Sequence, residues 1–161
     1  MNEQHERRMR LALQEAEKAG QKGEIPIGAI LVDASGHVLS AAHNQTITRA
    51  DPTAHAEVLV LRAAARAVGN YRLLNTTLYV TIEPCIMCMG AIVHARVATL
   101  VFGAADPKWG GAGSLYDLAA DSRLNHRPQV VSGICEPACR ALLQAFFRSK
   151  RNRAGSDEVH Y

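Results

Sequence analysis

Two short stretches of the chain carry residue types that together can do metal chemistry. One is residues 53–57 (Thr-Ala-His-Ala-Glu) and the other is residues 83–88 (Glu-Pro-Cys-Ile-Met-Cys). The imidazole of His55 and the thiols of the second stretch can hold a zinc ion and leave its fourth tetrahedral position open for water. Glu57 stands two residues after His55, where its carboxylate can exchange protons with that water. The two stretches therefore predict a catalytic zinc site with a base beside it.

Each stretch taken by itself also has a simpler interpretation. Cys-x-x-Cys can be half of a structural zinc site or a redox pair, and an acidic residue at a helix start can simply favour the helix dipole. The combination favours catalytic zinc, because a proline precedes Cys85 and both stretches fall at expected helix starts. Cys135 and Cys139 could form a second metal site. No matching His or Cys pair accompanies them, so we expect buried, unreactive thiols.

Strand-like and helix-like patterns alternate along the rest of the chain. Apolar runs predict strands near residues 26–32, 37–42, 77–82, 99–102 and 129–133. Helical spacing predicts helices near residues 3–20, 51–68, 85–95 and 136–153, with a further short helix near 115–120. Asp51-Pro52 is the expected start of the second helix, since aspartate can cap it and proline suits its first turn. We expect the second and third helices to be largely buried, because they are apolar on nearly every face.

This alternation predicts an α/β fold, a three-layer α/β/α sandwich around a central mixed five-stranded sheet. We expect parallel pairs beyond the first hairpin. Functional residues in such sheets gather where strands lead into helix N-termini, and both stretches stand at such places. Cys85 and Cys88 are three residues apart at a helix start, which puts both sulfurs on one face and favours their thiolates.

Length and composition indicate one globular domain. The chain has 161 residues, of which 48% are hydrophobic and 20% charged. We expect a single domain over residues 1–153 and a flexible C-terminal tail over 154–161. Charges throughout residues 1–20 exclude a signal peptide, and no apolar run approaches the roughly 20 residues of a membrane span. A cytoplasmic protein with no membrane contact is the expectation.

The positions of the charged residues are more informative than the net charge. A net charge of +3 is too small to identify a nucleic-acid binder. Residues 137–156, however, contain no acidic residue and five basic ones: Arg140, Arg148, Lys150, Arg151 and Arg153. The last predicted helix therefore has a basic face, which fits either phosphate contacts or an ordinary solvated surface.

The chain resembles the zinc-dependent nucleoside and nucleobase deaminases. Residues 55–57 and 84–88 match their H-x-E…P-C-x-x-C signature. Further stretches resemble the bacterial tRNA-specific adenosine deaminases of that family, namely residues 51–57, 70–73, 78–81, 83–85, 101–103, 113–115, 125–127 and 146–148. The resemblance implies a cytidine deaminase-like fold and hydrolytic conversion of adenosine to inosine at the wobble position of a tRNA anticodon. It also implies a homodimer with one Zn²⁺ in each subunit.

The same resemblance implies roles for individual residues. His55, Cys85 and Cys88 would bind zinc, and Glu57 would carry the protons. The residues that it places against the anticodon stem-loop are Asn44, Ala56, Pro84, Asp106, Lys108, Phe147, Arg148 and Arg151. Among these, Asn44 would hydrogen-bond the flipped base. The chain departs from the family at Gln45-Thr46, where Arg-Pro or a similar pair often follows the asparagine.

Two other functions fit parts of the sequence. An enzyme of the same fold could act on a free base or nucleoside, as guanine and cytosine deaminases do, but it would not need Asn44, the segment 106–108 or the basic helix. A nucleic-acid-binding module could use the zinc structurally. That function does not explain Glu57 or the missing fourth protein ligand.

Overall fold

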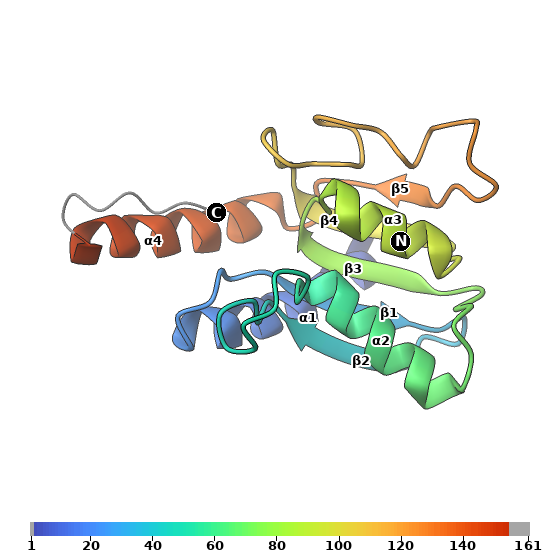
Figure 1. Cartoon of the computed structure of the whole chain (residues 1–161), viewed down its shortest axis with the longest axis horizontal. Helices are drawn as coiled ribbons and strands as arrows, with labels where there is room; N and C mark the ends of the chain where they lie inside the picture. The colour runs from blue at the N-terminus through green and yellow to red at the C-terminus, as the bar shows by residue number, and fades with distance from the viewer. Residues whose placement is uncertain (1, 155–161) are drawn as a thin grey trace.

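The computed structural model describes residues 2–154 (Figure 1). Its elements, in chain order, are α1 (Asn2–Gln21), β1 (Gly28–Val32), β2 (Val38–His43), α2 (Ala56–Val68), β3 (Thr77–Ile82), α3 (Ile86–His94), β4 (Thr99–Ala104), β5 (Gln129–Val131) and α4 (Glu136–Ala154). Residues 155–161 of the expected tail lie outside the described residues. Within residues 2–154, no helix is long and apolar enough to cross a membrane.

The five strands form one sheet with helices on both faces, as predicted. Helices α2 and α3 lie on one face, with α1 and α4 on the other (Figure 1). Alternate residues of β3 face opposite layers: Leu78 joins the core under α2 and α3, whereas Tyr79 joins the core under α1 and α4. Both faces of the central strands are covered, which explains why these strands are continuous apolar runs.

The direction of one strand pair differs from the prediction. The sheet order is β2-β1-β3-β4-β5. The β3–β4 and β4–β5 pairs are parallel, but β1 is antiparallel to both β2 and β3. The expectation of parallel pairs beyond the hairpin was therefore wrong for β1–β3. The α2 crossover passes over β1 and returns in the direction of β2, so the carboxyl ends of β2, β3 and β4 share one edge of the sheet.

One predicted helix boundary and one predicted helix were also wrong. Helix α2 begins at Ala56, not near Asp51. The Asp51 carboxylate accepts hydrogen bonds from the backbone N–H (2.8 Å) and hydroxyl (2.7 Å) of Thr53, so this segment forms its own turn. The helix expected near residues 115–120 does not form either, because Asp117 pairs with Ala112 in an isolated β-bridge.

Helix α4 starts against the sheet and then projects beyond it (Figure 1). Cys139 packs against β4 at Gly103, where a Cβ atom would lie only 2.4 Å from the cysteine sulfur. Cys139 is 1% exposed, and burial raises the pKa of its thiol to about 12. Cys135 is only partly buried. The prediction of buried, unreactive thiols is thus confirmed for Cys139 and only in part for Cys135.

Candidate active site

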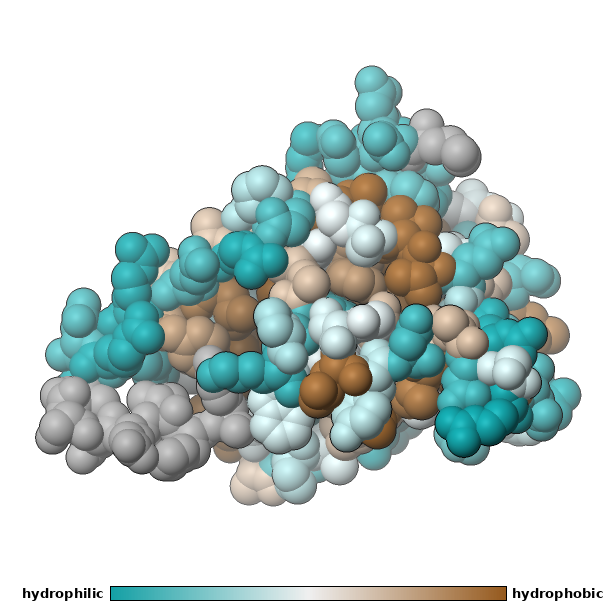
Figure 2. Space-filling model, turned by 90° about the horizontal axis from the view of Figure 1, so that it is seen from above, coloured by the Kyte–Doolittle hydropathy of each residue, from teal (hydrophilic) through white to brown (hydrophobic). Residues whose placement is uncertain are grey.

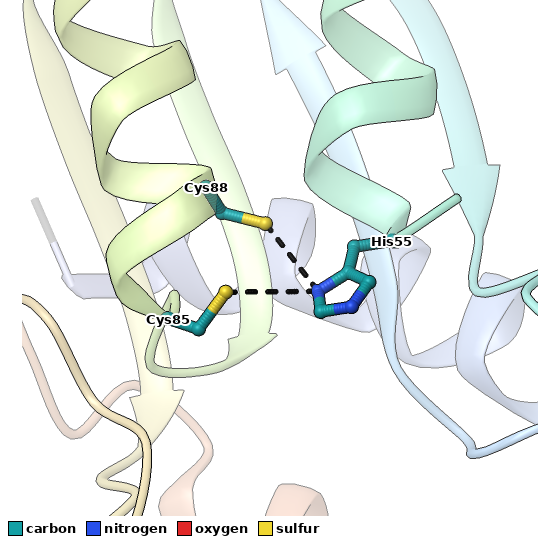
Figure 3. A group of neighbouring side chains, drawn as sticks. All are labelled: His55, Cys85 and Cys88. Atoms are coloured by element: carbon teal, nitrogen blue, oxygen red, sulfur yellow. Dashed lines mark hydrogen bonds between the residues drawn. The ribbon is translucent and has the colours of Figure 1, made fainter. Parts of the chain in front are cut away.

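His55, Cys85 and Cys88 meet at the edge of the sheet and point toward one another (Figure 3). The Nδ1 atom of His55 lies 3.7 Å from the sulfur of Cys85 and 3.5 Å from that of Cys88. Tetrahedral zinc, with Zn–S of about 2.3 Å and Zn–N of about 2.0–2.1 Å, holds such atoms about 3.6 Å apart. The three side chains therefore fit zinc as they stand. Among the described residues, they are the only candidate cluster of three or more His, Cys, Asp or Glu side chains.

Two of the three residues occupy helix N-caps. His55 precedes α2 and Cys85 precedes α3, both with extended backbone, and neither side chain makes a capping hydrogen bond. N-caps are usually Ser, Thr, Asp or Asn, and losing such a cap costs about 1 kcal/mol. Here both side chains are turned to the shared site instead. The free N–H groups and positive dipole ends of both helices favour anionic thiolates there.

Glu57 lies in the first turn of α2 and is 4% exposed. Its carboxyl group hydrogen-bonds the Cys88 thiol, and burial raises the pKa of Glu57 to about 6. Hydrogen bonds from Cys88 and His55 lower the pKa of the Cys85 thiol to about 4. The site thus combines an acidic thiol with a buried carboxyl group suited to proton transfer near neutral pH.

These groups open onto a cavity of about 470 Å³. Its most buried polar lining residues are Asn44, Glu57 and Glu83, which are 3–4% exposed. Farther out, the lining includes the exposed apolar residues Ile86, Met87 and Trp109. Helix α4 contributes Arg140, Leu143 and Phe147. The cavity therefore has a polar, buried end beside the zinc ligands and a mostly apolar mouth.

The structure brings most of the predicted site residues to this cavity. They are Asn44, His55, Glu57, Cys85, Asp106, Lys108 and Phe147. Cys88 is buried at the ligand cluster. Ala56 and Pro84 are also buried but do not line the cavity. Arg148 and Arg151 are exposed on α4, outside it. The roles of these residues toward RNA stay predictions.

Asn44 is held from two sides at the buried end of the cavity. Its backbone N–H donates to Ile27 O (3.0 Å), and its Nδ2 donates to the hydroxyl of Thr46 (3.4 Å). Thr46 belongs to the pair at which the sequence departs from the family pattern. The departure therefore supplies a hydroxyl that orients the amide, and the amide still lines the cavity.

Sequence reasoning missed Glu83, which organises one wall of the cavity. Its carboxylate accepts hydrogen bonds from the backbone N–H groups of Asp106 (3.1 Å), Ala112 (3.0 Å) and Ser114 (3.1 Å), and from the Ser114 hydroxyl. Gly110 passes so close that a Cβ atom there would lie 2.3 Å from this carboxylate. One signal was available: an acidic residue that ends a buried apolar strand needs partners.

A second buried carboxylate, Glu24, holds the loop on the other side of Asn44. It is 0% exposed and accepts hydrogen bonds from the backbone N–H groups of Ile47 (3.1 Å) and Thr48 (2.7 Å). Burial opposes ionisation, but a hydrogen bond from the Thr48 side chain and these two backbone bonds outweigh it and lower the pKa of Glu24. No sequence signal could have found this role, because the partners are backbone groups of an irregular loop.

Comparison with known proteins agrees with this geometry. Residues 2–104 match the family model of the cytidine and deoxycytidylate deaminase zinc-binding region. The chain is 49% identical over 146 residues to the tRNA-specific adenosine deaminase of Haemophilus influenzae, which covers 91% of this chain and 84% of that protein. The chain belongs to the family of zinc-binding cytidine and deoxycytidylate deaminases. The Bacillus subtilis tRNA-specific adenosine deaminase is also 49% identical, over 150 residues, or 93% of this chain and 92% of that one.

Solved structures of deaminases confirm the predicted fold class. One comes from a study of A-to-I editing by tRNA:A34 deaminases at the wobble position of transfer RNA. It superposes with a TM-score of 0.82 at 44% identity, over 85% of this chain and 99% of that chain. A guanine deaminase from Nitrosomonas europaea has a TM-score of 0.77 at 24% identity, over 88% and 83% of the two chains, and shares the fold. Among deaminases, the fold thus serves different substrates.

We expect His55→Ala and Cys88→Ala to lose the zinc and to unfold at lower temperature, because metal binding and folding are coupled. A loss of about 2 kcal/mol would lower the Tm of a domain of this size by about 4–8 °C. Zinc per chain after dialysis and thermal unfolding would be measured on the same preparations. Cys135→Ala, which removes a thiol outside the cluster, is the control and should keep its zinc. A His55→Ala protein that keeps one zinc per chain would contradict the ligand assignment.

Proposed function

We propose that this chain hydrolyses adenosine to inosine at the wobble position of a tRNA anticodon and releases ammonia. The observation that carries the proposal is the three-residue zinc site with a buried carboxyl group at the end of a cavity. It occurs in a chain that is 49% identical to a tRNA-specific adenosine deaminase, over 91% of this chain. A buried, polar cavity end suits a base that has been flipped out of the anticodon loop.

The residues of the site divide the chemistry among them. Zinc, when bound, supplies a Lewis acid with one open position, at which a water molecule becomes a nucleophile near neutral pH. Glu57 takes a proton from the attacking water and delivers it to N1 of adenine. It then passes a proton to the amino group that departs from C6. Asn44 hydrogen-bonds the base and holds C6 toward the metal ligands.

An RNA substrate accounts for the outer part of the cavity better than a free base does. Lys108 and Trp109 are exposed at the mouth, and α4 adds Arg140 and Phe147. A free guanine or cytosine would fill only the buried end. Nucleotides next to a flipped adenosine would occupy the rest, with the exposed Arg148 and Arg151 near their phosphates. The proposal includes a cytoplasmic location, where tRNA is found, and a single catalytic domain over residues 1–153.

We propose further that two copies of the chain form a homodimer. Helix α3 was expected to be largely buried, yet Ile86 and Met87 are 47% and 36% exposed, at the cavity mouth and not on a separate surface. Elsewhere, Leu115 and Tyr116 are more than half exposed, and hydrophobic surface lies between hydrophilic patches (Figure 2). Exposed apolar area of this kind favours a protein partner.

Light scattering of the proposed homodimer should give twice the 17.4 kDa of one chain. The mass of a single chain at micromolar concentration would count against the dimer.

Glu57→Ala should abolish deamination while zinc stays bound, since the carboxylate moves protons but is not a ligand. The loss should be at least about 100-fold, the usual minimum for a general acid–base group. Ammonia and inosine would be measured with an anticodon stem-loop carrying a wobble adenosine. Free adenosine, guanine and cytosine would be tested in parallel. Glu17→Ala, on the exposed face of α1, should leave the rate unchanged.

The substrate panel separates the candidate functions. Turnover of the stem-loop far above that of the free compounds supports the proposal. Turnover of guanine or cytosine without turnover of the stem-loop would contradict it and favour a free-base deaminase. If Glu57→Ala also lost its zinc, the proton-transfer role of Glu57 would be misassigned.

Replacing Arg148 and Arg151 together with alanine should weaken RNA binding and flatten its salt dependence. Each lost phosphate contact reduces the slope of log K against log salt by about 0.7–0.9, so the pair should reduce it by about 1.4–1.8. The dissociation constant of the stem-loop would be measured between low and high salt. Arg10→Ala, an exposed arginine of α1 paired with Glu6, serves as the control. An unchanged slope in the double variant would argue that this helix face is merely solvated.

A further inference from the structure

Trp109 is the only tryptophan of the chain, and it lies at the mouth of the cavity. Its side chain is 53% exposed beside Ile86 and Met87, which line the same mouth. Two other aromatic residues, Tyr71 and Tyr116, are exposed to a similar degree but do not line the cavity. An aromatic surface is therefore available next to the buried end of the cavity that suits the reacting base.

The backbone holds Trp109 at a fixed place relative to the zinc ligands. Its N–H donates to the carboxylate of Asp106 (3.2 Å). The next residue, Gly110, pairs with Cys85 in a β-bridge, and Gly111 N–H donates to Pro84 O (2.7 Å). The loop is thus attached directly to the segment that carries the ligand. An anchored aromatic group loses little freedom when a ligand stacks on it.

We propose that Trp109 is a stacking platform for the base next to the reacting adenosine, and that it thereby favours an RNA strand over a free nucleoside; this inference rests on the proposed function. Flipping the adenosine out of the loop leaves its neighbours unstacked. Proteins bind such bases by stacking them on aromatic side chains, which accept any base because every base has a π face. Lys108, adjacent in sequence and on the same cavity, is placed to approach the phosphate that links the two nucleotides.

A base is the occupant that the surroundings favour. The mouth is continuous with the polar cavity end that suits the flipped adenosine, so the next nucleotide of the strand must pass close to it. Its apolar side chains suit the face of a base. Lys108 and Arg140, on the same lining, suit the negative charge of the strand. A second copy of the chain covering Trp109 is the competing occupant, and the test includes it.

Because Trp109 is the sole tryptophan, its fluorescence reports stacking directly. We expect an anticodon stem-loop with a wobble adenosine to quench the emission of zinc-loaded Glu57→Ala protein, which binds the RNA without turning it over. Two further stem-loops would carry an abasic nucleotide on the 5′ or the 3′ side of the adenosine. One of the two should bind without this quenching. Equal quenching by all three RNAs would overturn the proposal.

Steady-state kinetics of the wild-type holoenzyme and its variants give an independent test. Trp109→Ala should raise KM for the stem-loop between about 5-fold and about 150-fold, the range of base–aromatic stacking. The kcat should stay within about twofold, because Trp109 does not touch the reacting atoms. Trp109→Phe should restore most of the affinity. Tyr71→Ala, at another exposed aromatic that does not line the cavity, should have no effect on KM.

Combining variant and RNA identifies the stacked base. With the wild-type protein, the abasic RNA that loses quenching should raise KM by the same factor as the Trp109→Ala substitution does. With the Trp109→Ala protein, that RNA should raise KM no further. An unchanged KM in Trp109→Ala would overturn the proposal while leaving the deaminase function intact. A drop in mass by light scattering in Trp109→Ala would overturn it in favour of a dimer contact. A wild-type protein that does not deaminate the stem-loop would overturn both the function and this inference.

Discussion

The structure depends on two helix N-termini that converge on one point. Strands β2 and β3 run in the same direction, so the helices that follow them begin at the same edge of the sheet. Their N-cap residues, His55 and Cys85, make no capping bonds, and their ligand atoms are 3.7 Å apart, as two ligands of one zinc ion would be. This arrangement gives up two ordinary helix caps. It also places the N–H groups of two helix N-termini near the two thiols, where they stabilise thiolate anions. An isolated Cys-x-x-Cys would have the N–H groups of one helix N-terminus.

Two buried carboxylates that take no part in the proposed reaction fix the loops around the site. Glu83 and Glu24 are almost fully buried, and each is satisfied by backbone N–H groups of an irregular loop. Irregular loops cannot satisfy their own N–H groups through a ladder, so a buried acceptor is an effective way to fix them. Glu83 fixes the loop that carries Asp106, Lys108 and Trp109, and Glu24 fixes the loop that follows Asn44. In the proposed function, the reaction would depend on the helix ends, and the choice of substrate on the two anchored loops.

Much of this could be predicted from the sequence, because the signals are local. The ligand set follows from short spacings, and the sandwich follows from alternating apolar periods. The predictions that were wrong concern features set by contacts between distant segments. Asp51 caps a turn around Thr53 in preference to α2, and the α2 crossover passes over β1 and makes the β1–β3 pair antiparallel. The anchoring roles of Glu24 and Glu83 were missed for the same reason, since their partners lie 23–31 residues away.

The three protein ligands should leave one position of the zinc open, and X-ray absorption at the zinc edge of the purified protein tests this most directly. We expect two sulfur atoms at about 2.3 Å and two lighter atoms at about 2.0–2.1 Å, one from His55 and one from water. The lighter shell should change when a nucleoside analogue binds, because one of its members is exchangeable. A shell of three or four sulfur atoms, or one that no ligand alters, would mean a closed structural site and would contradict a deaminase mechanism.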